Sequence, residues 1–203
     1  MKKYSIKNFE GLFLIVFATT LTSCDRNLLE TLPNDRLSEG VFWKTETDAK
    51  LAVNALYTDL DDVNIVSWDA LTDIVHTNQS FNVQAYIELG THDATNSKIY
   101  EEWKKAYVGI RATNYFLENV DKINSANGTL INQFKGEAKV LRAYQYIKLV
   151  GFFGDVPLIT TPISIAEGQS IQRTPVAEVW RFVANELNEA AQLLPKTYAA
   201  TEK

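Results

Sequence analysis

The sequence predicts an all-α fold made of tetratricopeptide-like helix pairs joined by long irregular loops. Four segments carry apolar residues at a spacing of three to four, which is typical of amphipathic helices. The segments between them are rich in Asn, Gly and Pro, which favour turns and loops. With 46% hydrophobic and 11% aromatic residues, the 203-residue chain has enough apolar surface for a packed core.

The first two helices are predicted at about residues 46–61 and 99–122. Thr45 and Thr47 offer side-chain oxygens that can cap the first helix. The second helix is indicated by a long apolar stripe that also contains one amide, Asn114. Its members are Trp103, Tyr107, Ile110, Asn114, Leu117 and Val120. Asn127-Gly128 predicts the turn that separates this helix from the next.

The other two helices are predicted at about 130–150 and 175–195. The third has two apolar faces, so we expect it to pack between neighbouring helices. The fourth begins after Thr174-Pro175 and ends at Pro195. Residues 63–99 show no sustained period and are predicted to be mostly loop with short helical turns. A turn at Gly151–Gly154 and an extended connection through Pro162 are expected between the last two helices.

The first 24 residues have the features of an export signal. Three lysines precede the apolar run Leu12–Ala18, and Leu21-Thr22-Ser23-Cys24 follows. The run is too short for a membrane-spanning helix, and a cysteine at this place resembles the lipobox of bacterial lipoproteins. We therefore expect a signal peptide at 1–23, a lipidated tether at 24–38 with lipid on Cys24, and a helical domain at 39–203. The alternative is that Cys24, the only cysteine, is unmodified and buried.

The charge of the expected mature chain argues against nucleic acid as a partner. Three of the 20 basic residues and one of the 25 acidic residues precede Cys24, so 17 basic and 24 acidic residues remain. The net charge is then −7, and the sequence has no basic cluster. Phosphate backbones require such a cluster.

Several motifs together resemble the SusD/RagB-like family. They are Phe42-Trp43 before Asp48-Ala49, the stretch 52–57, Glu137-Ala138 to Arg142-Ala143-Tyr144, and Gly151-Phe152-Phe153-Gly154-Asp155-Val156-Pro157-Leu158. The resemblance implies a lipid-anchored protein of the cell outer membrane in Bacteroidetes, placed over a TonB-dependent SusC-like transporter. It also implies binding of glycans or other nutrients without cleavage. Members of that family are longer, so the domain at 39–203 is expected to be incomplete and to lack further helices.

The resemblance places candidate ligand-binding residues in the irregular stretch around Thr72-Asp73. Sugar rings stack on flat aromatic faces, and amides or carboxylates bind their hydroxyl groups. The candidates are Trp68, Asp69, Asp73, His76, Asn78, Phe81 and Tyr86. The alternative is that Trp68, Phe81 and Tyr86 are core residues. The tryptophan-rich loop of starch-binding relatives is missing, which argues against starch.

Catalytic and metal-binding patterns are not evident in the sequence. It contains no Gly-x-Ser-x-Gly pentapeptide, and its two histidines are not at a metal-binding spacing. Glu186 and Glu189 share a helix face that we expect to be solvated. Glu137 and Arg142 are interpreted as helix-bracing charges, with a ligand clamp as the alternative. We therefore expect no enzyme activity, no cofactor and no metal. A helical scaffold that binds a protein or peptide partner is the alternative function.

Overall fold

The computed structural model describes residues 42–60, 66–76, 83–93, 95–124 and 127–197. The expected signal peptide, Cys24, the tether, and the candidates Asn78 and Phe81 lie outside these residues. In the described part of the chain all regular structure is helical, apart from one isolated bridge between Val156 and Thr174. Within the same ranges, no helix combines the length and apolar character needed to cross a membrane. The predicted all-α class is confirmed.

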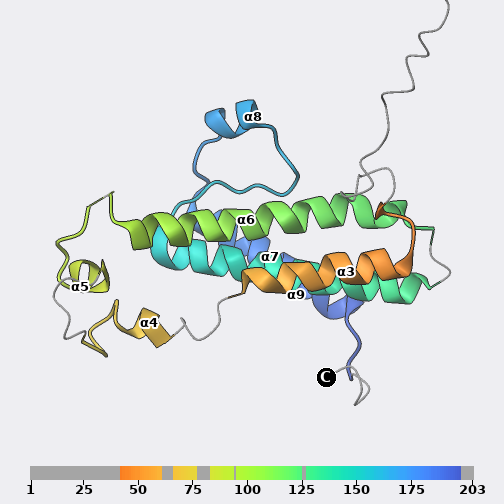
Figure 1. Ribbon diagram of the computed structural model, residues 1–203, viewed down its shortest axis with the longest axis horizontal. Coiled ribbons are helices and arrows are strands. Elements are labelled where there is room, and N and C mark those ends of the chain that lie inside the picture. Colours follow the sequence, from red (N-terminus) through yellow and green to blue (C-terminus); the bar gives the residue numbers. More distant parts are fainter. Residues whose placement is uncertain (1–41, 61–65, 77–82, 94, 125–126, 198–203) are drawn as a thin grey trace, which may run out of the picture. The chain divides into compact units, whose positions relative to one another are not determined.

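Four long helices lie lengthwise beside one another (Figure 1). They are α3 (Glu46–Leu56), α6 (Ser97–Asn119), α7 (Gly128–Phe153) and α9 (Val176–Leu193). Helix α3 is extended by a 3₁₀ turn at Tyr57–Asp59, and α6 by another at Val120–Lys122. These bounds agree with the four predicted helices to within a few residues. The expected turn at Gly151 is wrong, because α7 continues through Phe153 and ends only at Gly154, where φ is +66°.

Local sequence explains where these helices begin. Thr45 and Asp48 form a reciprocal capping box at the start of α3. Asn96 caps α6 and Asn127 caps α7, each by accepting backbone N–H groups of the first turn. The predicted turn at Asn127-Gly128 is thus the N-terminus of α7.

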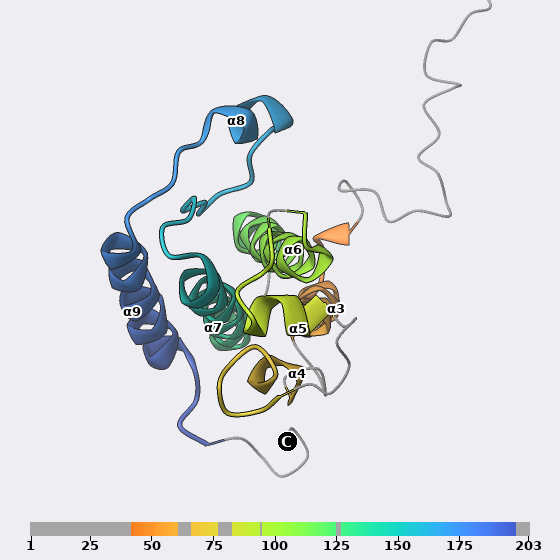
Figure 2. The same ribbon diagram turned by 90° about the vertical axis from the view of Figure 1, so that its left-hand side faces the viewer.

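Helix α7 packs between α9 on one side and α6 with α3 on the other, as the end-on view shows (Figure 2). This agrees with its two predicted apolar faces. One core cluster joins α3, the second half of α6 and the first half of α7 around Trp43, Val53 and Phe116. A second cluster joins the first half of α6, the second half of α7, and α9 around Ile110, Tyr146 and Val183. The antiparallel α6–α7 pair therefore carries both cores.

Two less regular segments lie against this bundle. The first holds the short helices α4 (Val66–Asp69) and α5 (Val83–Glu88), in agreement with the predicted loop with helical turns. The second, residues 155–174, is here called the strap. It is extended at first, as predicted, and then forms helix α8 (Ile165–Ser170), which projects from the bundle in both views (Figures 1 and 2). The sequence analysis missed α8.

Candidate functional site

The predicted ligand-binding residues lie on what we call the α4–α5 surface, residues 66–76 and 83–92. Trp68 is half-buried there. Phe152 contacts the ring edge-to-face at 5.3 Å, and Nζ of Lys148 lies 4.9 Å from the ring centroid. The indole Nε1 is buried without a hydrogen-bond partner. These contacts cover the ring of Trp68, so they favour the alternative in which it packs as a core residue.

The other described candidates on this surface are exposed. Asp69, Asp73 and His76 face solvent, and the side chain of Tyr86 is 46% exposed. Nδ1 of His76 forms an ion pair with the carboxylate of Glu88 when the imidazole is protonated. Among the candidate aromatics that the structure describes, Tyr86 therefore has the ring available for stacking.

A hollow of about 340 Å³ lies beneath this surface, between α5, α6 and the end of α7. Its wall includes Glu102, whose carboxylate oxygens lie 2.6 Å from Nζ of Lys98 and 3.1 Å from Nζ of Lys148. Burial acts to raise the pKa of Glu102. The two lysines outweigh it, through hydrogen bonds and their charges, and hold the pKa below the usual value. Glu102 thus remains ionised at neutral pH and joins α6 to α7.

A buried ionic cluster connects α7 to α9 and corrects one prediction. Arg142, 5% exposed, donates from Nε to Glu186 at 2.8 Å. Lys139 bridges Glu186 at 2.9 Å and Glu189 at 2.7 Å. The expected solvated face is therefore wrong for Glu186, which is buried because it continues the inward stripe of α9 and meets two cations. The cations engage both carboxylates, so the pair lacks the free carboxylates of a glycosidase site.

Side chains of α6 and α7 donate hydrogen bonds to the backbone carbonyls of the strap. Tyr107 Oη donates to the carbonyl of Pro157 at 2.8 Å, and Tyr146 Oη to that of Ile159 at 2.9 Å. Nδ2 of Asn114 donates to the carbonyls of Ile159 and Thr161, at 3.0 and 3.3 Å. Further donors are Arg142 to Thr160 and Arg111 to Ile163. Five carbonyls of residues 157–163 thus accept from the bundle, so Arg142 braces the strap as well as α9.

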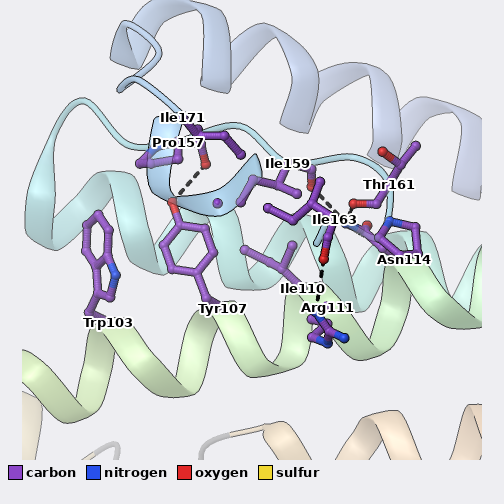
Figure 3. Close-up of a pocket in the computed structure, with 12 residues that line it drawn as sticks. Trp103, Tyr107, Ile110, Arg111, Asn114, Pro157, Ile159, Thr161, Ile163 and Ile171 are labelled. Atoms are coloured by element: carbon purple, nitrogen blue, oxygen red, sulfur yellow. Dashed lines mark hydrogen bonds between the residues drawn. The ribbon is translucent and has the colours of Figure 1, made fainter. Parts of the chain in front are cut away.

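Between the strap and α6 lies a pocket of about 300 Å³, called the strap pocket (Figure 3). Its floor is the α6 face of Trp103, Tyr107 and Ile110, and its roof includes Ile163 and Ile171. Sequence reasoning assigned the α6 residues to a helix stripe and did not identify a pocket. The available signal was Asn114, an amide within an otherwise apolar stripe.

The architecture of the described residues is typical of one class of protein. They form a helical-pair domain with two aromatic-lined hollows and no cluster of three or more metal-ligating side chains. Such an architecture is typical of a binding protein.

Comparison with known proteins identifies the family. A family model described as starch-binding and associating with the outer membrane matches residues 44–203, so the chain belongs to the SusD-like family. Two curated relatives from Formosa agariphila, SusD-like proteins P38 and P2, are each 29% identical to it, over 96% and 97% of this chain. The chain spans 39% of the length of each of these relatives.

Solved structures agree with this assignment. A SusD-like protein from Bacteroides fragilis has a TM-score of 0.74 at 24% identity, over 85% of this chain and 34% of its own, and shows the shared fold. A laminarin-binding SusD-like protein has a TM-score of 0.72 at 27% identity, over 79% of this chain and 37% of its own. The predicted family and helical architecture are confirmed.

Proposed function

We propose that this protein binds glycans at the outer membrane without cleaving them and passes them to a TonB-dependent SusC-like transporter. The observation that carries the proposal is the family match over residues 44–203, because the matched family is described as starch-binding. A relative at 27% identity binds laminarin, which makes a glucan a sensible first ligand to test.

The α4–α5 surface is the proposed contact with neutral glycans. Tyr86 supplies an exposed ring for stacking, and Asp69 and Asp73 supply exposed carboxylates that can accept hydrogen bonds from sugar hydroxyls. His76 and the candidates Asn78 and Phe81 belong to the same stretch of chain. Trp68 supports this surface from below, through its contacts with Phe152 and Lys148.

Calorimetry with laminarin and other neutral oligosaccharides tests the proposal. The protein is produced from Asp25, beside a second preparation that includes any coding sequence downstream of Lys203. We expect binding that Tyr86→Ala weakens about tenfold, since stacked rings contribute on the order of 1 kcal/mol. Trp180→Ala, which removes a similarly exposed ring from α9, serves as the control. Failure of both preparations to bind any glycan would refute the function.

Anchoring and delivery are tested separately in cells. We propose that lipid on Cys24 holds the mature protein in the outer membrane, so Cys24→Ser should abolish incorporation of labelled fatty acid and release the protein from that fraction. Co-purification of the wild-type protein with a TonB-dependent transporter would support delivery. Recovery of the wild-type protein in the inner membrane would contradict the proposed location.

One observation favours the scaffold alternative. Trp180 and Leu187 on α9 are 45% and 38% exposed, and Val140 and Ile147 on α7 are 37% and 38% exposed. Exposed apolar residues on neighbouring helices are typical of protein-binding surfaces. Under this alternative Trp180→Ala would disrupt a protein complex, and Tyr86→Ala would have no effect on any ligand.

A further inference from the structure

Arg111 lines the strap pocket, and Arg173 lies against Trp103, one of the residues that line it; both arginines use few of their hydrogen-bond donors. Nη1 of Arg111 donates to the carbonyl of Ile163 at 3.3 Å, and Nη1 of Arg173 donates to that of Asp155 at 2.6 Å. Both side chains are exposed, and neither forms an ion pair with any carboxylate in the described ranges. Each guanidinium thus uses one of its five N–H donors on a neutral acceptor.

The two carboxylates of the strap, Asp155 and Glu167, accept hydrogen bonds at the starts of α9 and α8. Oδ1 of Asp155 accepts the backbone N–H of Val176 at 2.8 Å, at the start of α9. The carboxylate of Glu167 accepts from the backbone N–H and the hydroxyl of Ser164, both at 2.7 Å, and completes the capping box of α8. These two carboxylates lower the local positive charge, but neither forms an ion pair with Arg111 or Arg173.

The two guanidinium groups lie near different residues of α6. Arg173 lies over the ring of Trp103, with its guanidinium carbon 5.4 Å from the ring centroid. Arg111 is eight residues further along α6 than Trp103, which corresponds to about 12 Å of helix. We therefore expect a ligand that contacts both arginines to span more than one sugar ring.

Between the arginines the pocket offers apolar surface and few free polar groups. The phenol of Tyr107 and the amide of Asn114 are both bound to strap carbonyls, as Figure 3 shows. The remaining floor is the ring of Trp103 and the side chain of Ile110. This arrangement suits a ligand with an apolar face and anionic groups at its edges, since guanidinium binds carboxylate and sulfate oxygens in a bidentate manner.

We propose that the strap pocket binds an acidic glycan segment, in which Arg111 and Arg173 contact carboxylate or sulfate groups on different sugars of the same chain. The proposal rests on the proposed glycan-binding function and adds a substrate class to it. It also separates two surfaces: the α4–α5 surface contacts neutral sugars, and the strap pocket selects for negative charge. The net charge of −7 expected for the mature chain repels polyanions, so acidic glycans need such a local site in order to bind.

Calorimetry with a tetra-uronate, its carboxyl-reduced counterpart and a sulfated tetrasaccharide tests the proposal on the protein produced from Asp25 and on the longer preparation. We expect the tetra-uronate or the sulfated tetrasaccharide to bind at least tenfold more tightly than the carboxyl-reduced oligosaccharide. Arg111→Gln and Arg173→Gln should each weaken that binding about tenfold, while Arg111→Lys should lose less. Arg181→Gln, which removes an exposed guanidinium from α9, is the matched control and should bind normally.

The outcomes separate this proposal from the general function. Neutral glycans that bind through Tyr86, together with no preference for acidic ones, would overturn the strap-pocket proposal and leave the function intact. If Arg181→Gln weakens binding as much as Arg111→Gln and Arg173→Gln do, the loss of affinity reflects overall charge, and the proposal is also overturned. An acidic peptide that binds as tightly as the tetra-uronate and is lost in the same variants would assign the pocket to a protein partner. Absence of all glycan binding would refute both the pocket and the function.

Discussion

The strap and the α4–α5 surface are both largely irregular, yet the helix bundle holds them in different ways. Carbonyls of the strap at residues 157, 159, 160, 161 and 163 accept hydrogen bonds from side chains of α6 and α7. Tyr146 is fully buried beneath it and both donates to and accepts from Ile159. The strap is therefore anchored by groups that would be costly to leave unpaired.

The α4–α5 surface depends mainly on one side chain, Trp68, for its described contacts with α7. Around it Ile74 is 79% exposed and Leu89 is 65% exposed. Few buried apolar contacts and many exposed groups are the features of segments that open locally at low free-energy cost. Many hydrogen bonds therefore hold the strap in place, whereas the α4–α5 surface has few anchoring contacts among the described residues and should open more easily.

The largest effect on stability is expected from replacing Arg142, which binds both the strap and α9. Arg142→Met removes the buried cation that binds Glu186, Asn114 and Thr160. The free energy of unfolding should fall by about 3–5 kcal/mol, because a buried carboxylate loses a charged partner. Denaturant unfolding measures the loss. Adding Glu186→Leu to this variant should recover part of the lost stability. If Arg142→Met lowers the free energy of unfolding by less than about 1 kcal/mol, the cluster is dispensable.

A smaller effect on stability is expected from a substitution at Gly154, where α7 ends and the strap begins. Gly154 has φ +66° and ψ −117°, a backbone conformation that side chains disfavour. Gly154→Ala should therefore destabilise the protein by about 1–3 kcal/mol. Gly151→Ala, three residues earlier in the helix and with open space at its Cβ position, should stabilise it by about 0.5–1 kcal/mol. Equal changes in melting temperature would contradict this account.

Alkaline pH should weaken the anchoring of the strap. Burial raises the pKa of the Tyr146 phenol to about 12 from the ordinary 10.0. A raised folded-state pKa gives stability that is fully present below pH 10 and is lost as the pH rises through about 12. Tyr146→Phe should cost about 1 kcal/mol at neutral pH and should flatten the decline above pH 10. Unfolding free energies measured from pH 8 to pH 11 test this, and an unchanged slope would contradict it.

The same contrast explains what the sequence could predict. The four long helices follow from local patterns, namely apolar stripes and caps such as Thr45 and Asn127. The strap pocket cannot be predicted from local patterns. Its walls meet only when α6 and residues some 50 positions later in the chain have folded together. Tyr107 looked like an ordinary stripe member, only the amide of Asn114 stood out in the stripe, and nothing local marked Pro157 or Ile159 as acceptors.

Two features that were not predicted, helix α8 and the burial of Glu186, could have been recognised from the sequence. Ser164 and Glu167 have the spacing of a capping box, which marks the start of α8. Glu186 is three residues after Val183 and four before Ala190, so it continues the buried stripe of α9. Its charge led to the expectation of a solvated face. A carboxylate in an apolar stripe signals a buried cationic partner, here Arg142.

The smallest expected effect on stability comes from the α4–α5 surface itself. Tyr86→Ala removes a side chain that is 46% exposed, so the free energy of unfolding should change by less than about 0.5 kcal/mol. Trp68→Ala on the same surface should cost about 1–2 kcal/mol, since it removes the ring contacts with Phe152 and Lys148. Hydrogen exchange should then show faster exchange over residues 66–76 and 83–92 in Trp68→Ala, with the strap protected as before. Faster exchange in the strap as well would mean that the two segments open together, and the contrast between them would not hold.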